Sequence, residues 1–147
     1  ENHELLGRVG RWPTRRALLV DGIPCTLVHG HPKDPVFGYA YEDRLVVSEF
    51  PEGLTVLGAT HRPFVRREGN KTILNAGSVG YPRDHGTWGS LALFDTQTRQ
   101  STIVRFDISE SLARIESTHP DLDPKVLETF RRRVPEDRLV GIRWSQA

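Results

Sequence analysis

Short apolar runs separated by turn residues occupy the middle of the chain and predict a sheet. Leu54–Leu57 and Thr72–Leu74 are β-branched or aliphatic runs that end at turn residues, as buried strands do. Gly69, followed by asparagine, lies before the second run and predicts a hairpin. A loop with His61 follows the first strand, and a glycine-rich loop, 75–80, follows the second. We expect the two loops to emerge side by side at one edge of the sheet.

Two further hairpins follow from the same pattern. Arg16–Val20 and Pro24–Val28 are apolar runs that flank the tight-turn dipeptide Asp21-Gly22. Ser90–Phe94 and Ser101–Phe106 alternate apolar and polar residues, which predicts a hairpin with one exposed face.

Helical patterns occur outside these strands. Asp34–Phe50 spaces its aromatic and aliphatic residues three to five positions apart, which predicts a surface helix. Ser109–Thr118 predicts another helix, and a further one begins with Asp123 as its N-cap and Pro124 in the first helical position. The first six residues, ENHELL, are typical of the polar start of a helix.

Composition excludes several classes of protein. The length of 147 residues, without internal repeats or low-complexity linkers, predicts a single domain over 1–147. The 20 basic and 19 acidic side chains give no clear nucleic-acid-binding patch. The single cysteine, Cys25, excludes a disulfide framework and fits a reducing compartment. No signal peptide or membrane-length apolar run is present, so we expect a cytoplasmic protein without a membrane partner.

Histidines at the ends of predicted strands are the candidate chemistry. His29 and His31 follow one strand, and His61 follows another. Imidazole with hard oxygen ligands suits zinc, manganese, iron or nickel, and the long spacing indicates a site collected from separate strand ends. The Asn75–Gly80 loop has glycines at its third and sixth positions, which lets backbone N–H groups approach a ligand. An ordinary turn is the alternative interpretation of that loop.

The segments VHGHP, VLGATHRPF and LNAGSVGYPRD, in this order and spacing, resemble the calcineurin-like metallophosphoesterases, and within them the small bacterial phosphodiesterases of the YfcE-like branch. The resemblance runs from Ala17 to Phe106, and the closing RLVGIRW resembles the family's C-terminal helix end. It implies an α/β fold, a metallophosphoesterase-type β-sandwich flanked by helices (α/β/β/α), of which this chain covers the C-terminal portion.

The resemblance implies a role for each matching residue. Asn2, His29 and His61 would be metal ligands, and His3 would be the catalytic acid for the leaving oxygen. The cofactors implied are two divalent metal ions, with manganese expected first and zinc, iron, nickel and magnesium as alternatives. His31 is a candidate substitute ligand.

The same resemblance implies metal-dependent hydrolysis of phosphate esters, as a phosphodiesterase acting on a small phosphorylated substrate. The residues that would border the substrate pocket are Asn75, Gly77, Ser78 and Arg83.

Two departures from the family pattern weaken the site. Ala59 stands where the family has the first histidine of Gly-His-Thr-His, and a methyl group cannot bind metal. The first two family motifs, Asp-x-His and Gly-Asp-x-x-Asp, do not occur in these 147 residues. Because they would precede Asn2, and the sequence contains no methionine, we expect an N-terminal half upstream of this portion.

Three interpretations stay open. The protein is a metal-dependent phosphoesterase, or a catalytically weakened scaffold of the same fold that binds protein partners, or an enzyme in which Ala59 is an engineered substitution. Substrate, metal identity and oligomeric state, including a homo-oligomer, are not decided by the sequence.

Overall fold

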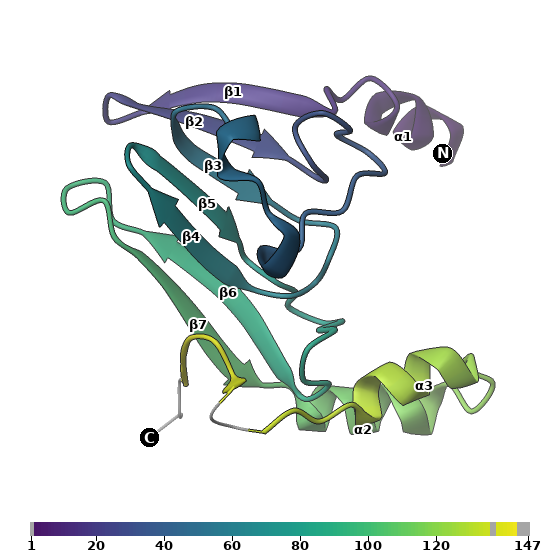
Figure 1. Ribbon diagram of the computed structural model, residues 1–147. Helices are drawn as coiled ribbons and strands as arrows, with labels where there is room; N and C mark the ends of the chain where they lie inside the picture. Colours follow the sequence, from purple (N-terminus) through teal and green to yellow (C-terminus); the bar gives the residue numbers. More distant parts are fainter. Residues whose placement is uncertain (1, 136–137, 144–147) are drawn as a thin grey trace.

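The computed structural model describes residues 2–135 and 138–143, and its strands form two sheets (Figure 1). The first sheet contains β1 Arg15–Val20, β2 Ile23–Val28, β3 Gly53–Leu57, β4 Phe64–Glu68 and β5 Lys71–Asn75, and the second contains β6 Trp88–Phe94, β7 Ser101–Asp107 and β8 Ile142–Arg143. The helices are α1 Asn2–Val9, the 3-10 turns η1 Glu42–Arg44 and η2 Val47–Glu49, α2 Ser109–Thr118 and α3 Pro124–Arg131.

The first sheet brings three strand ends to one edge. Its order is β1-β2-β3-β5-β4, and β2, β3 and β5 run parallel. Val28 pairs with Leu57, and Leu57 pairs with Asn75, so the three strands end at the same level. We call this side of the sheet the loop edge. The outer strands β1 and β4 are antiparallel to β2 and β5, which confirms the two hairpins predicted here.

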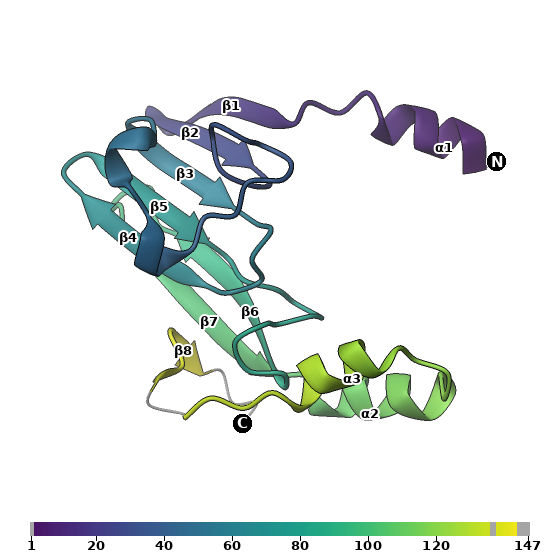
Figure 2. The ribbon, with the colours of Figure 1, turned by 45° about the vertical axis from the view of Figure 1, so that its right-hand side comes forward.

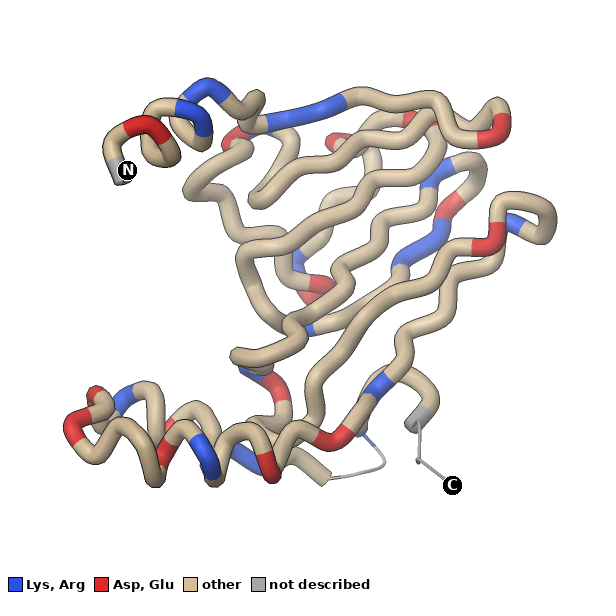
Figure 3. The backbone as a smooth tube through the Cα atoms, turned by 180° about the vertical axis from the view of Figure 1, so that it is seen from behind, with Lys and Arg blue, Asp and Glu red and all other residues tan. Residues whose placement is uncertain are grey.

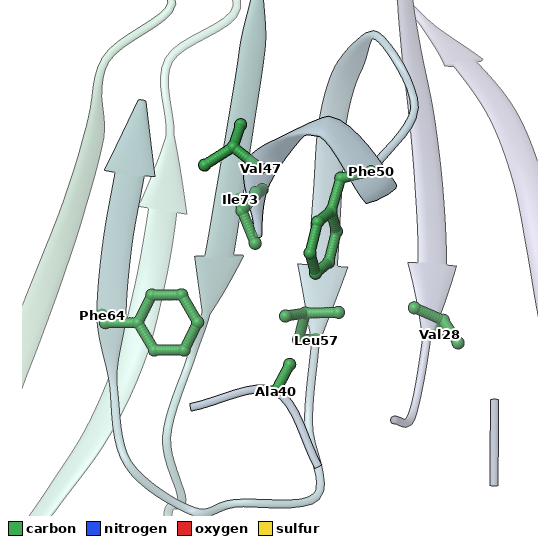
Figure 4. Close-up of a cluster of buried hydrophobic side chains, with 7 residues drawn as sticks. All are labelled: Val28, Ala40, Val47, Phe50, Leu57, Phe64 and Ile73. Carbon is green, nitrogen blue, oxygen red and sulfur yellow. The ribbon is translucent and has the colours of Figure 1, made fainter. Parts of the chain in front are cut away.

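Burial on both faces of the first sheet confirms the sandwich. Leu54 and Leu74 share a buried cluster with Ile103 of the second sheet. Leu57 and Ile73 belong to a cluster on the opposite face, shown in Figure 4. Strands with apolar side chains on both faces bury more apolar surface than edge strands do. This burial stabilises the centre of the sheet.

The predicted surface helix over Asp34–Phe50 is wrong. This segment is irregular apart from η1 and η2. The Asp34 carboxylate accepts a hydrogen bond from the backbone N–H of Phe37, and such a local turn competes with helical hydrogen bonding. The apolar residues Val47 and Phe50 are buried against the first sheet, so their spacing reflects burial rather than a helical period.

Strand β7 of the second sheet is followed by the two predicted helices, α2 and α3, which lie side by side in both ribbon views (Figures 1 and 2). The prediction for Ser109–Thr118 matches α2. At the start of α3, the Asp123 carboxylate accepts a hydrogen bond from Lys125 N at 2.8 Å, with Pro124 following the cap as predicted. Phe106 and Phe130 belong to the apolar cluster that joins these helices to the sheet. No helix among the described residues combines the length and apolar character needed to cross a membrane.

The closing RLVGIRW segment differs from the expected helix end. Ile142–Arg143 form a short strand parallel to β7, with Ile142 opposite Val104. Gly141, with φ of 110°, turns the chain into this pairing, because a residue with a side chain rarely adopts that conformation. Residues 144–147 lie outside the described part of the chain.

Candidate functional site

The two histidine-bearing loops meet at the loop edge, as the sequence predicts. His29 follows β2, and the loop containing His61 follows the neighbouring parallel strand β3. Gly58 N donates a hydrogen bond to the carbonyl oxygen of His29 at 2.9 Å. A methyl group at position 58 would lie 3.3 Å from His29 Nδ1, so the imidazole of His29 lies against the start of the loop that carries His61.

The ring of His61 is oriented by the main chain. Its Nδ1 lies 2.8 Å from the carbonyl oxygen of Tyr81, which only accepts hydrogen bonds, so Nδ1 carries the proton and donates. Nε2 of the neutral ring therefore keeps its lone pair. Metal-binding histidines are commonly fixed in this way by a carbonyl or carboxylate. The ring of His29 is exposed, and neither of its nitrogens bonds another described residue.

The loop after β3 has a strained backbone. Ala59 and His61 both have positive φ, 57° and 55°, a conformation that costs a residue with a side chain about 1–2 kcal/mol. Asn75 anchors this loop, because its Nδ2 donates to Gly58 O at 2.8 Å and to Thr60 Oγ1 at 3.1 Å. Non-glycine residues in such conformations cluster at functional sites.

Asn75 supports the site and does not line it. The residue is fully buried, and its Oδ1 accepts a hydrogen bond from Gly77 N at 2.9 Å. Its whole amide is therefore engaged in joining the β3 and β5 loops, which explains its place at the strand end without substrate contact.

Gly77 and Ser78 also have structural roles. Ser78 N donates to Ser90 Oγ at 3.0 Å, and Ser78 Oγ accepts from Tyr81 N at 2.9 Å. The N–H groups of Gly77 and Ser78 are therefore satisfied inside the protein and do not form an open phosphate cradle. Ser90 was not predicted as part of the site. Its signal in the sequence is a polar residue at a buried position of an otherwise apolar strand.

Arg83 is the predicted substrate residue that lines a cavity. Its N–H donates to His61 O at 3.1 Å, so this cavity adjoins the candidate metal ligand. The cavity has a volume of about 310 Å³. We call it the cationic pocket, and its lining consists of Tyr41, Thr60, Arg62, Tyr81, Arg83, Lys125, Thr129 and Arg132.

His31 does not have a free ring nitrogen. Its Nδ1 accepts a hydrogen bond from Lys33 N at 3.2 Å, and its Nε2 lies 3.3 Å from a carboxylate oxygen of Glu49. The ring also packs edge-on against Phe50, with 4.9 Å between the ring centres. Both ring nitrogens of His31 are therefore engaged by Lys33 and Glu49. The structure gives no support to His31 as a substitute ligand.

The predicted third motif, Asn2 with His3, lies at the start of α1. His3 is exposed on α1, which projects from the rest of the chain in both ribbon views (Figures 1 and 2). The side chain of Asn2 lies outside what the structure describes. Beyond α1, Trp12 and Pro13 line a mostly apolar cavity of about 710 Å³ together with His29.

The described residues supply part of a metal centre. They contain no group of three or more His, Cys, Asp and Glu side chains that could hold a metal ion. His29 and His61 have the chemistry of ligands to a divalent ion and lie on loops that follow neighbouring strands, but two imidazoles are fewer than the three or four protein ligands that such an ion usually takes.

Comparisons with known proteins show which family and which solved structures the chain is similar to. Residues 2–99 match the model of the calcineurin-like phosphoesterase superfamily domain. A hypothetical protein from Pyrococcus horikoshii OT3 is similar in structure, with a TM-score of 0.71 at 16% identity over 88% of this chain and 54% of that chain. A metallophosphoesterase from Sphaerobacter thermophilus gives 0.68 at 25% identity over 86% of this chain and 62% of that chain.

No curated protein matched the sequence. The chain spans little more than half the length of the two similar structures, and the match does not resolve a branch such as the YfcE-like proteins. The matched residues are nevertheless more than half of this sequence. The chain therefore belongs to the calcineurin-like phosphoesterase superfamily.

Proposed function

We propose that this chain is the part of a metal-dependent phosphodiesterase that supplies His29 and His61 to a centre of two divalent metal ions. The observation that carries the proposal is the fixed ring of His61, whose Nδ1 is tied to Tyr81 O so that Nε2 is available as a ligand. A small phosphate diester is the proposed substrate class.

The metal ions would polarise the phosphoryl group and lower the pKa of a bound water to the range of a nucleophile. This chain's own contribution is to place two imidazoles at the loop edge and to hold the loops rigidly through Asn75. Manganese is the proposed metal, with zinc, iron, nickel and magnesium as alternatives. The further ligands would have to come from residues outside those that the structure describes.

Ala59 favours a second candidate function, a scaffold of this fold that binds protein partners. Alanine stands where the family resemblance implies a metal-binding histidine, and its backbone is left-handed. The enzyme remains the first proposal because neither ring nitrogen of His29, nor Nε2 of His61, bonds another described residue. A purely structural role does not require such nitrogens at the loop edge.

Metal binding tests the proposal directly. In the whole protein, with the further ligands present, titration calorimetry with Mn²⁺ should show about 10-fold or greater loss of affinity in His61→Ala, because a ligand is removed. His119→Ala is the matched control, since His119 is an exposed histidine at the end of α2 and should bind as the unaltered chain does. Equal Mn²⁺ affinity in both variants would contradict the proposal.

Restoring the missing imidazole separates the enzyme from the scaffold. In the whole protein, we expect Ala59→His to bind Mn²⁺ about 10-fold or more tightly than the unaltered protein and to raise manganese-dependent hydrolysis of bis(nitrophenyl) phosphate. The left-handed backbone at position 59 accepts this change without new strain, because alanine already carries a Cβ there. Unchanged hydrolysis with improved metal binding would favour the scaffold.

A further inference from the structure

Four cations line the cationic pocket, and no acidic residue of the described part of the chain lines it with them. They are Arg62, Arg83, Lys125 and Arg132. Within the described part of the chain, none of the eight lining residues is acidic, and none of the four cations forms an ion pair with a carboxylate. Figure 3 shows basic and acidic residues on most other segments, with a basic stretch on β1. Like charges at close range repel one another, so an unpaired group of four favours binding of an anion.

The pocket is built from four segments that are distant in sequence. Arg62 lies over the ring of Tyr41, 5.8 Å from its centre, and Arg83 lies over Tyr81 at 5.7 Å. Tyr81 OH lies 3.3 Å from Thr129 Oγ1, which joins the loop after β5 to α3. Cation–π contacts restrain the two guanidinium groups, so less side-chain entropy is lost when an anion binds.

The pocket adjoins the candidate metal ligand. Thr60 and Arg62 are the residues on either side of His61, and Arg83 N is bonded to His61 O. Arg132 Nη1 donates to Arg83 O at 2.8 Å, which extends the positive lining from the loop edge to the end of α3. If the phosphoryl group of a substrate lies near His61, a group attached to that phosphoryl group would therefore reach the pocket.

We infer that the cationic pocket binds a second phosphoryl group of the substrate, so that the preferred phosphodiester carries a further phosphate beyond the bond that is cleaved. This inference rests on the proposed function. Arginine recognises phosphate oxygens through paired N–H donors, and lysine adds a point charge. The volume of about 310 Å³ lies at the lower end of small-molecule sites and suits one phosphate with part of its carrier, rather than a nucleic-acid strand.

Binding of pyrophosphate without metal tests the pocket separately from hydrolysis. Titration calorimetry on the full chain at low salt should show pyrophosphate binding that weakens about 10-fold in the double variant Arg62→Gln with Lys125→Gln, because two charged donors are lost from a partly exposed site. The matched control is Arg114→Gln with Arg131→Gln, which removes two exposed cations from α2 and α3 outside the pocket and should change the dissociation constant less than twofold.

Three results would overturn the inference. They are no pyrophosphate binding, equal weakening in the control, or binding of citrate as tight as that of pyrophosphate, which would indicate diffuse attraction of any polyanion. Thermal unfolding of both double variants checks that they are folded. Arg83 and Arg132 are kept because each takes part in a main-chain hydrogen bond of the loop.

Hydrolysis then tests the substrate class. The two substitutions Arg62→Gln and Lys125→Gln are introduced into the manganese-loaded Ala59→His protein. They should raise KM about 10-fold for a phosphodiester that bears a distal phosphate. KM for bis(nitrophenyl) phosphate should stay unchanged. Equal effects on both substrates would contradict the inference. Absence of all hydrolysis with intact pyrophosphate binding would overturn the proposed function and leave an anion site.

Discussion

Single residues at the loop edge are fixed by hydrogen bonds to their neighbours. Asn75 uses its amide to hold Gly58 O, Thr60 Oγ1 and Gly77 N. Burying an amide is unfavourable unless it is bonded, so each of these contacts is needed once the residue is buried. The result is a rigid support below His61, which keeps a strained backbone in place.

Gly77 gives a sharp test of this rigidity. It has φ of 77°, and a Cβ there would lie 2.0 Å from Ser90 Oγ. We expect Gly77→Ala to lower the free energy of unfolding by about 2–4 kcal/mol through backbone strain and overpacking, measured by urea denaturation. Gly80→Ala, in the same loop, meets nothing within 4 Å and should change it by less than about 0.5 kcal/mol. An equal decrease of the free energy of unfolding in both variants would mean that the loop is not packed against Ser90 in the way described.

At the scale of elements, local hydrogen bonds define where helices start. Asp107 ends β7, and its carboxylate accepts a hydrogen bond from Ser109 N at 2.8 Å, at the first residue of α2. Hydrogen bonds from Ser109 lower the pKa of the Asp107 carboxyl below its ordinary value of 3.8. The folded state therefore favours the ionised carboxylate at the start of this helix, where the helix dipole also favours negative charge.

Asp107 should make stability depend on pH. The folded pKa is lowered, so the stabilisation is complete above the unfolded pKa near 3.8 and is lost as the pH falls through the folded value. We expect Asp107→Ala to cost about 0.5–1 kcal/mol of unfolding free energy at pH 7, after allowance for solvent screening. The cost should shrink below about pH 4. Asp121→Ala, an exposed aspartate after α2, should show neither effect.

At the scale of the whole molecule, one buried ion pair joins the loop beside the site to the second sheet. Arg105 on β7 is fully buried, and its Nη1 and Nη2 lie 2.9 and 3.2 Å from the two carboxylate oxygens of Asp84. Asp84 follows Arg83 in the loop whose Tyr81 carbonyl orients His61. The second sheet thereby helps to position a residue at the edge of the first sheet.

Removing one partner of this pair should lower the stability of the fold, because the other charge stays buried without its partner. We expect Asp84→Asn to lower the free energy of unfolding by about 3–5 kcal/mol in urea denaturation. Asp43→Asn breaks the exposed contact of Asp43 with Arg44 at 3.8 Å and should cost less than about 0.5 kcal/mol. Asp84→Leu combined with Arg105→Met should be less destabilising than Asp84→Leu alone. If Asp84→Asn is as mild as Asp43→Asn, the pair does not join the two parts.

The local sequence determined most elements of this protein. Apolar runs and turn dipeptides predicted the three hairpins, and Asp123 with Pro124 predicted the start of α3. The hairpins and the helix start depend on contacts between residues close in sequence and on strand periodicity, which a single sequence carries. The parallel pairing of β2 with β3 and of β3 with β5, which brings the loops of His29 and His61 to one edge, joins strands distant in sequence and is decided by the tertiary structure.

Tertiary structure alone decided what several side chains do. The segment 34–50 lies on the sheet as an irregular chain because burial of Phe50 outweighs helical propensity. Asn75 became a support and His31 a packing residue because of partners far away in sequence. The cationic pocket joins Arg62 to Lys125 across 62 intervening residues. Such pairings depend on how the elements pack against one another, and no local pattern in the sequence records that.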